Sequence, residues 1–108
     1  MREISAKVLK EMMDKDVDFV LIDARAHDSY DREHLPGALS MPSDHLGEHV
    51  LADYKKERTI VTYCTGWSCG ASSVAAQKLE KFGFKKVLLF KGGLEDWKKA
   101  GYATQKQF

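Results

Sequence analysis

The chain has 108 residues, of which 44% are hydrophobic, so it can bury one core, and we expect a single domain over residues 1–108. Its 17 Lys and Arg residues nearly balance 16 Asp and Glu residues, and the formal net charge of +1 gives no attraction for nucleic acid or an anionic membrane. No apolar run reaches transmembrane length, and the first residues lack the apolar stretch of a secretory signal. We therefore expect a cytoplasmic protein whose partners are small molecules or other proteins.

The first half of the chain alternates between helical and extended patterns. Residues 4–13 place their apolar side chains on one helical face, which predicts a helix. Residues 18–23 form a nearly continuous apolar run, which is typical of a strand buried on both faces. A Pro-Gly turn then leads into a short extended piece within residues 36–42, and a helix is predicted over residues 44–54.

The second half continues the alternation. We predict strands over residues 59–63 and 86–90, and helices over residues 72–84 and 94–102. Strands that are separated by helices require right-handed crossovers, and such crossovers build a parallel sheet. No internal repeat, linker or low-complexity tract interrupts the pattern.

Two cysteines, Cys64 and Cys69, lie five residues apart, directly after the strand predicted over residues 59–63. In a parallel sheet, ligands bind beyond the carboxyl ends of the strands, where a loop leads to the start of a helix. Gly66 and Gly70 are expected to let the loop turn its backbone amides inward, and the helix start adds unpaired N–H groups. Such a cradle favours an anion, either a bound ligand or the thiolate itself.

The thiolate form of a cysteine is the nucleophile, so its ionisation matters. A free thiol with a pKa of ~8.5 is only about 3% ionised at neutral pH. Lowering this pKa by about two makes the thiol mostly ionised, which requires roughly 2.7 kcal/mol of stabilisation of the thiolate. A helix start and a few amides can supply that stabilisation. We therefore expect Cys64 to be exposed with a lowered pKa; the alternative is a buried, inert thiol.

Two further stretches resemble a known family. The segment VLIDARAHDSYDREHLPGALSMP, residues 20–42, resembles the opening signature of the rhodanese family, and VLLFKGGLEDWKKAGY, residues 87–102, resembles its closing signature. The cysteine loop lies between them, so the match covers nearly the whole chain. The resemblance implies a rhodanese-like α/β fold, with a five-stranded, mostly parallel sheet flanked by helices on both faces. It also implies that Cys64 becomes a persulfide during sulfur transfer.

A sulfurtransferase of this kind requires no metal or organic cofactor. The Cys64 thiolate attacks the outer sulfur of an anionic donor such as thiosulfate or a persulfide, and cyanide, a thiol or a protein acceptor then removes that sulfur. The negative charge on sulfur is expected to be stabilised by backbone amides of the active-site loop. This loop consists of Thr65, Gly66, Trp67, Ser68, Cys69 and Gly70.

Three residues outside the loop are candidates for supporting the site. Asp23 and Arg25 are expected to hold the strand end by charged hydrogen bonds, because a carboxylate that closes a buried strand needs a partner. Lys91 follows the last predicted strand, where its ammonium either helps to bind an anionic donor or remains solvated. The ring of Trp67 shields the thiol, stacks on a partner or packs locally, and the sequence does not separate these roles.

Other functions are open at this stage. A thiol/disulfide redox protein would use Cys64 and Cys69 as an exchanging pair, and a protein-binding rhodanese module would normally lack the first of these thiols. A cysteine phosphatase would need an arginine where this chain has Gly70, six residues after the cysteine. The H-x-x-E-H spacing from His45 to His49 is that of some zinc peptidases, but no third ligand accompanies it, so no metal site is expected.

The second cysteine is not needed by the ordinary sulfurtransferase mechanism. Cys69 either packs under the loop, attacks the inner sulfur of a Cys64 persulfide to form a disulfide, or resolves a sulfenic acid. Five residues on a glycine-containing turn are compatible with the ~7 Å limit between the Cα atoms of a disulfide.

Overall fold

The computed structural model describes residues 1–107, apart from the side chain of Val50, so the last residue of the domain predicted over 1–108 lies outside it. These residues form one five-stranded sheet with the strand order β1-β5-β4-β2-β3, and all four strand pairings are parallel. The expected mostly parallel sheet is thereby confirmed. The strands are β1 (Arg2–Glu3), β2 (Val20–Asp23), β3 (Leu39–Ser40), β4 (Thr59–Tyr63) and β5 (Lys86–Phe90).

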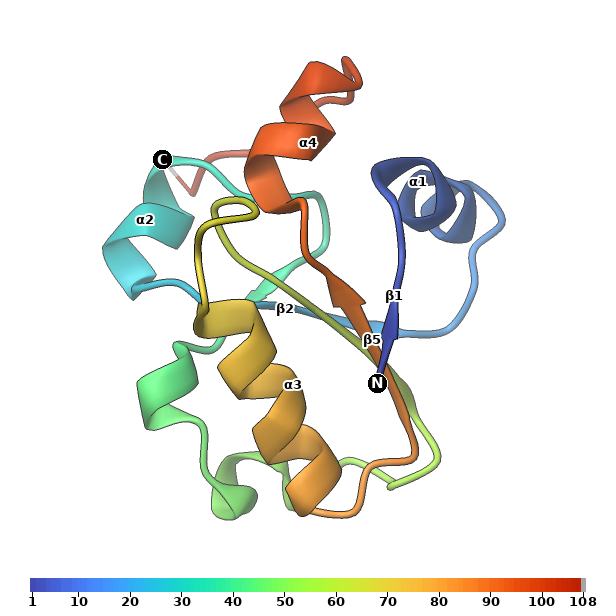
Figure 1. Ribbon diagram of the computed structural model, residues 1–108, viewed down its shortest axis with the longest axis vertical. Coiled ribbons are helices and arrows are strands. Elements are labelled where there is room, and N and C mark those ends of the chain that lie inside the picture. Colours follow the sequence, from blue (N-terminus) through green and yellow to red (C-terminus); the bar gives the residue numbers. More distant parts are fainter. Residues whose placement is uncertain (108) are drawn as a thin grey trace.

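Helices cover both faces of this sheet, as expected (Figure 1). The α-helices are α1 (Ala6–Asp14), α2 (His27–Arg32), α3 (Ala71–Lys81) and α4 (Gly93–Lys99), and two short 3₁₀ helices are η1 (Ser43–His45) and η2 (Glu48–Leu51). Val20 and Ile22 of β2 pack with α3 on one face, whereas Leu21 packs with α1 and α4 on the other. The continuous apolar run of β2 therefore serves two cores, because successive side chains of a strand point to opposite faces. None of the helices in residues 1–107 combines the length and apolar character needed to span a bilayer.

The helix predicted over residues 44–54 is wrong. The chain forms η1 and η2 instead, and between them Gly47 adopts an extended conformation with φ −122° and ψ 164°. Glycine is a poor helix former, and here it divides the segment into two pieces too short for an α-helix.

Two elements of the structure, β1 and α2, were not predicted from the sequence. Strand β1 has only two residues, both exposed, and therefore no run of apolar side chains. Helix α2 has the sequence HDSYDR, which contains one aromatic residue and no apolar stripe. Neither element carries the periodicity on which the predictions depend.

The strand register brings three of the predicted site residues to one edge of the sheet. Asp23 is paired with Tyr63 across β2 and β4, and Tyr63 is paired with Phe90 across β4 and β5. Cys64 and Lys91 directly follow these strand ends. The carboxyl edge of the sheet is therefore the place where the predicted residues meet.

Candidate active site

Cys64 lies between the end of β4 and the loop that leads to α3, as predicted. Its side chain is completely buried, with 0% of its surface exposed. The sulfur lies 3.3 Å from the carbonyl oxygen of Cys69 and 3.3 Å from the hydroxyl oxygen of Ser72. The expectation of an exposed thiol is wrong for this conformation, because the loop folds back over the sulfur.

The burial of Cys64 also changes its ionisation. Burial raises the pKa of the Cys64 thiol above its ordinary value, and the interaction with the Cys69 thiol raises it further. The hydroxyl and backbone N–H of Ser72, at the start of α3, lower the pKa but do not compensate. The predicted lowering is therefore wrong for the closed loop, although the helix start does face the sulfur.

The second cysteine has the opposite tendency. Cys69 is only half-buried. Burial raises its pKa, but the Cys64 thiol, the backbone N–H groups of Thr65 and Ala71 and the charge of Lys91 lower it, and the net shift is downward. Cys69 is therefore the more accessible and the more easily ionised thiol of the pair.

Gly66 and Gly70 were expected to give the loop its shape, but neither of them adopts a conformation that is reserved for glycine. Neither Gly66 nor Gly70 has a positive φ, and Gly70 has φ −90° at the start of α3. The special backbone position is Gly93, at the start of α4, with φ +60°. A Cβ atom on Gly93 would overlap the carbonyl oxygen of Cys64, so the close approach of α4 to the loop depends on this glycine.

Helix α4 fixes the base of the loop. The backbone N–H of Leu94 donates to the Cys64 carbonyl oxygen at 3.0 Å, and that of Glu95 donates to the Thr65 carbonyl oxygen at 2.9 Å. These two amides at the start of α4 have no partners within the helix and are satisfied by the loop instead. The base of the loop is consequently tied to the start of α4.

Lys91 and a tryptophan fix the rest of the loop. The Lys91 ammonium donates to the Cys69 carbonyl oxygen at 3.1 Å and lies 3.3 Å from the Ser73 hydroxyl oxygen. The indole of Trp67 donates to the Asp96 carboxylate at 2.9 Å, while 59% of the side chain remains exposed. The neighbouring Ser68 is exposed as well. Lys91 thus lies at the loop, and its ammonium holds a loop carbonyl oxygen.

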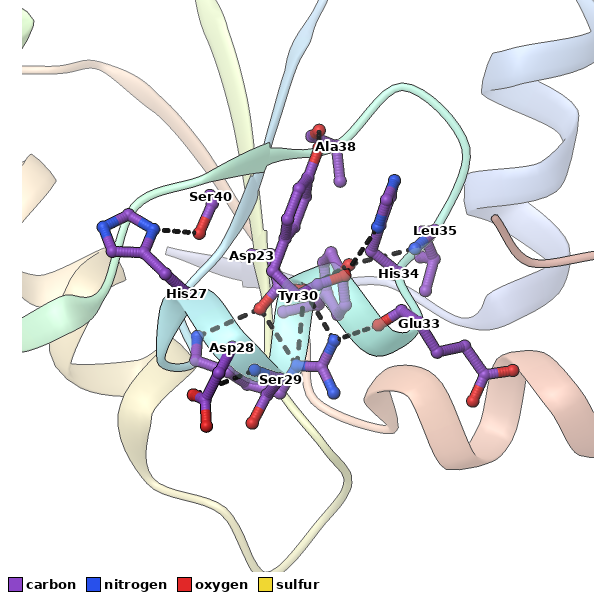
Figure 2. Close-up of polar contacts among 12 residues, drawn as sticks. Asp23, His27, Asp28, Ser29, Tyr30, Glu33, His34, Leu35, Ala38 and Ser40 are labelled. Carbon is purple, nitrogen blue, oxygen red and sulfur yellow. Dashed lines mark hydrogen bonds and ion pairs between the residues drawn. The ribbon is translucent and has the colours of Figure 1, made fainter. Parts of the chain in front are cut away.

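Asp23 and Arg25 form the predicted charged hydrogen bonds, as a buried ion pair. Figure 2 shows the polar contacts around Asp23. One carboxylate oxygen accepts the backbone N–H and the Nε of Arg25, both at 3.0 Å, and the other accepts an Arg25 Nη at 2.8 Å and the Tyr63 hydroxyl at 2.7 Å. Burial and the Asp23 charge raise the pKa of Tyr63, so its hydroxyl stays protonated. The hydroxyl oxygen in turn accepts the backbone N–H of Leu35 at 3.0 Å.

The histidines of the H-x-x-E-H pattern do not share one helical face. His45 belongs to η1 and His49 to η2, and both side chains are exposed. Across residues 1–107, no cluster of three or more His, Cys, Asp or Glu side chains is arranged to hold a metal ion.

Comparison with known proteins agrees with this architecture. A family model described as "Rhodanese-like domain" matches residues 5–100. The thiosulfate sulfurtransferase GlpE of Coxiella burnetii is 38% identical over 85 residues, 75% of this chain and 73% of that protein. YrkF of Bacillus subtilis is 32% identical over 95 residues, 88% of this chain, but this chain spans only 50% of that protein.

A solved structure matches just as broadly. The crystal structure of the BH2092 protein from Bacillus halodurans superposes with a TM-score of 0.92 at 29% identity, over 98% of this chain and 77% of that one. The family match covers strands β2 to β5, the cysteine loop and the helices α1 to α4 in a single alignment, and only β1 precedes it. The chain therefore belongs to the rhodanese-like domain family.

Proposed function

We propose that this protein is a sulfurtransferase that carries sulfane sulfur as a persulfide on Cys64. The observation that carries the proposal is the position of the Cys64 sulfur, 3.3 Å from the Ser72 hydroxyl at the start of α3. A helix start stabilises negative charge, which both a thiolate and a persulfide anion bear. The similarity to a protein named thiosulfate sulfurtransferase supports the same reaction class.

Opening of the loop is a necessary step, because a donor cannot touch a sulfur that is fully buried. Displacing the Cys69 end of the loop removes both influences that raise the pKa of Cys64, namely its burial and its contact with the Cys69 thiol. The Ser72 hydroxyl and N–H, which lower the pKa, belong to α3 and stay in place. Opening therefore exposes the thiol and activates it in the same movement.

The sulfur transfer then proceeds in two displacements. The Cys64 thiolate attacks the outer sulfur of thiosulfate, the sulfur–sulfur bond of the donor breaks, and sulfite leaves with the electron pair. A thiolate or cyanide next attacks the outer sulfur of the persulfide, and the Cys64 thiolate is the leaving group. A small anion or a protein persulfide would serve as donor, and a thiol, cyanide or a protein thiol as acceptor. We place this chemistry in the cytoplasm, where thiols are kept reduced.

The test is the rate of thiocyanate formation from thiosulfate and cyanide. Cys64→Ser should lower this rate by about 10³-fold or more, because the variant lacks the sulfur nucleophile. Val74→Ser is a matched control, since it introduces serine at a 44% exposed position of α3 away from the sulfur. A Cys64→Ser rate equal to that of the control would refute the proposal.

A further inference from the structure

The two cysteines of the loop are arranged as a pair. The loop turns back on itself through a hydrogen bond from the Cys69 N–H to the Gly66 carbonyl oxygen at 3.1 Å. This turn brings Cys69 over Cys64, whose sulfur lies 3.3 Å from the Cys69 carbonyl oxygen. The Cys69 thiol raises the pKa of Cys64, and the Cys64 thiol lowers the pKa of Cys69, in keeping with this proximity. Sulfur transfer through Cys64 alone does not require a second cysteine at this position.

The surroundings of Cys69 favour a thiolate. The Lys91 ammonium is fixed on the Cys69 carbonyl oxygen at 3.1 Å, and its positive charge acts on the neighbouring thiol. The backbone N–H groups of Thr65 and Ala71 act in the same direction. A thiolate is the form that attacks a sulfur–sulfur bond, so Cys69 is prepared to react with an oxidised sulfur on Cys64.

The closed loop favours one product over another. A persulfide adds a sulfur atom to the Cys64 side chain, which already has no exposed surface when the loop is closed. A disulfide between the two cysteines adds no atom. After loading in the open state, reclosure of the loop thus favours expulsion of the added sulfur.

We propose that Cys69 resolves the Cys64 persulfide, so that reclosure of the loop releases hydrosulfide and leaves a Cys64–Cys69 disulfide. The inference rests on the proposed function, since it requires the persulfide. The Cys69 thiolate attacks the Cys64 Sγ, a bond forms between the two Sγ atoms, and the bond from Cys64 to the sulfane sulfur breaks. The electron pair leaves with the sulfane sulfur as HS⁻, which is reduced while the two cysteines are oxidised. A small dithiol or two monothiols then reduce the disulfide and reset the protein.

The experiment uses the full chain, which is first reduced and then separated from the small-molecule reductant. It is kept under anaerobic conditions with thiosulfate as the only sulfur donor. Thiosulfate releases sulfite in the loading step, so any sulfide comes from the second step. The wild-type protein should lose the mass of two hydrogen atoms, release one equivalent of sulfide, and regain two free thiols with dithiothreitol. Cys69→Ser should instead gain the mass of one sulfur atom, removable by cyanide, and release about tenfold less sulfide or none. Val74→Ser should behave as the wild type.

The outcomes separate the two proposals. If wild type and Cys69→Ser both hold a stable persulfide and neither releases sulfide, the resolving role of Cys69 is wrong and the proposed function stands. If neither Cys69→Ser nor Cys69→Ala gains sulfur while both remain folded by circular dichroism, the persulfide itself is wrong. The wild-type measurement is decisive without any variant, because the disulfide and the sulfide must appear together.

Discussion

The neighbouring strands β2 and β4 end side by side, yet their ends bury different chemistry. Asp23 closes β2 and Cys64 follows β4, and both side chains are 0% exposed. The Asp23 carboxylate accepts five hydrogen bonds, from Arg25 and Tyr63, at 2.7–3.3 Å. The Cys64 sulfur has two hydrogen-bond partners, each at 3.3 Å: the Ser72 hydroxyl of α3 and the Cys69 carbonyl oxygen of the loop that covers it.

The difference indicates which strand end can move. A buried carboxylate is tolerated only while its partners remain, so the end of β2 is fixed. A neutral thiol makes weak hydrogen bonds and loses little when one of them is removed. The same edge of the sheet therefore has a rigid half, which carries the fold, and a half with weaker contacts at the sulfur, which we propose opens for the chemistry. Four experiments would break or sharpen this contrast.

The largest effect on stability is expected at the rigid half. Asp23→Ala leaves the Arg25 charge, whose side chain is only 10% exposed, without its buried partner. We expect the free energy of unfolding to fall by about 3–5 kcal/mol, measured by urea denaturation. Asp18→Ala is the control, because it removes an ion pair with Arg58 whose Asp18 side chain is 88% exposed; there the loss should stay below about 1 kcal/mol. Equal losses in the two variants would contradict a rigid strand end at β2.

A smaller loss is expected where α4 meets the loop. Gly93→Ala places a Cβ against the Cys64 carbonyl oxygen at a residue with φ +60°. We expect a loss of about 2 kcal/mol or somewhat more, from the left-handed conformation and the overlap together. Gly70→Ala provides the comparison, since its φ is −90° and no atom lies within 4 Å of the added Cβ. Its unfolding free energy should change by less than about 1 kcal/mol, and a loss as large as that of Gly93→Ala would show that the loop shape depends on Gly70.

The closed loop also predicts the order in which the two thiols react. Cys69 is half-buried with a lowered pKa, and Cys64 is fully buried with a raised pKa. Iodoacetamide at neutral pH should therefore alkylate Cys69 about tenfold faster than Cys64, as followed by peptide mass spectrometry. As pH rises, the Cys69 rate should reach its plateau below the pH expected for a free cysteine. Faster alkylation of Cys64 would mean that the loop is mostly open in solution.

The smallest effect is expected from the lysine that holds the loop. Lys91→Met removes the charge that lowers the pKa of Cys69, so a smaller fraction of Cys69 is ionised at neutral pH. Its alkylation should slow by about threefold at neutral pH and recover at alkaline pH, where the thiol ionises without help. Lys99→Met, at an exposed position of α4, should leave the rate unchanged. A loss of reactivity that persists at alkaline pH would point to a structural effect instead.

The sequence predicted the sheet well where burial leaves a local pattern. Strands β4 and β5 were predicted with their observed bounds, because each is a short apolar run of high strand propensity. The helix over residues 44–54 failed at Gly47, and α2 and β1 were missed because they lack an apolar face. Short, polar or glycine-divided segments take their structure from tertiary contacts, which no local pattern records.

The position of Cys64 at a strand end was predicted correctly, but its burial and the direction of its pKa shift were not. The place of Cys64 follows from the strand and helix on either side of it. Its burial depends on partners about thirty residues away, the amides of Leu94 and Glu95 and the ammonium of Lys91, which hold the loop closed. The direction of the pKa shift follows from that burial, so it could not be deduced from the residues next to the cysteine.

The central claim is that the covered thiol at the end of β4, Cys64, is the one that carries sulfur. The most direct test is to incubate Cys69→Ser and Cys64→Ser, each with a single cysteine, with thiosulfate that carries an isotopic label in its outer sulfur. The label should appear on the Cys64 peptide of Cys69→Ser, one sulfur for each protein molecule, and cyanide should release it as labelled thiocyanate. Stable label on Cys69 in the Cys64→Ser variant, together with an unlabelled Cys69→Ser variant, would contradict the account and make Cys69 the sulfur carrier.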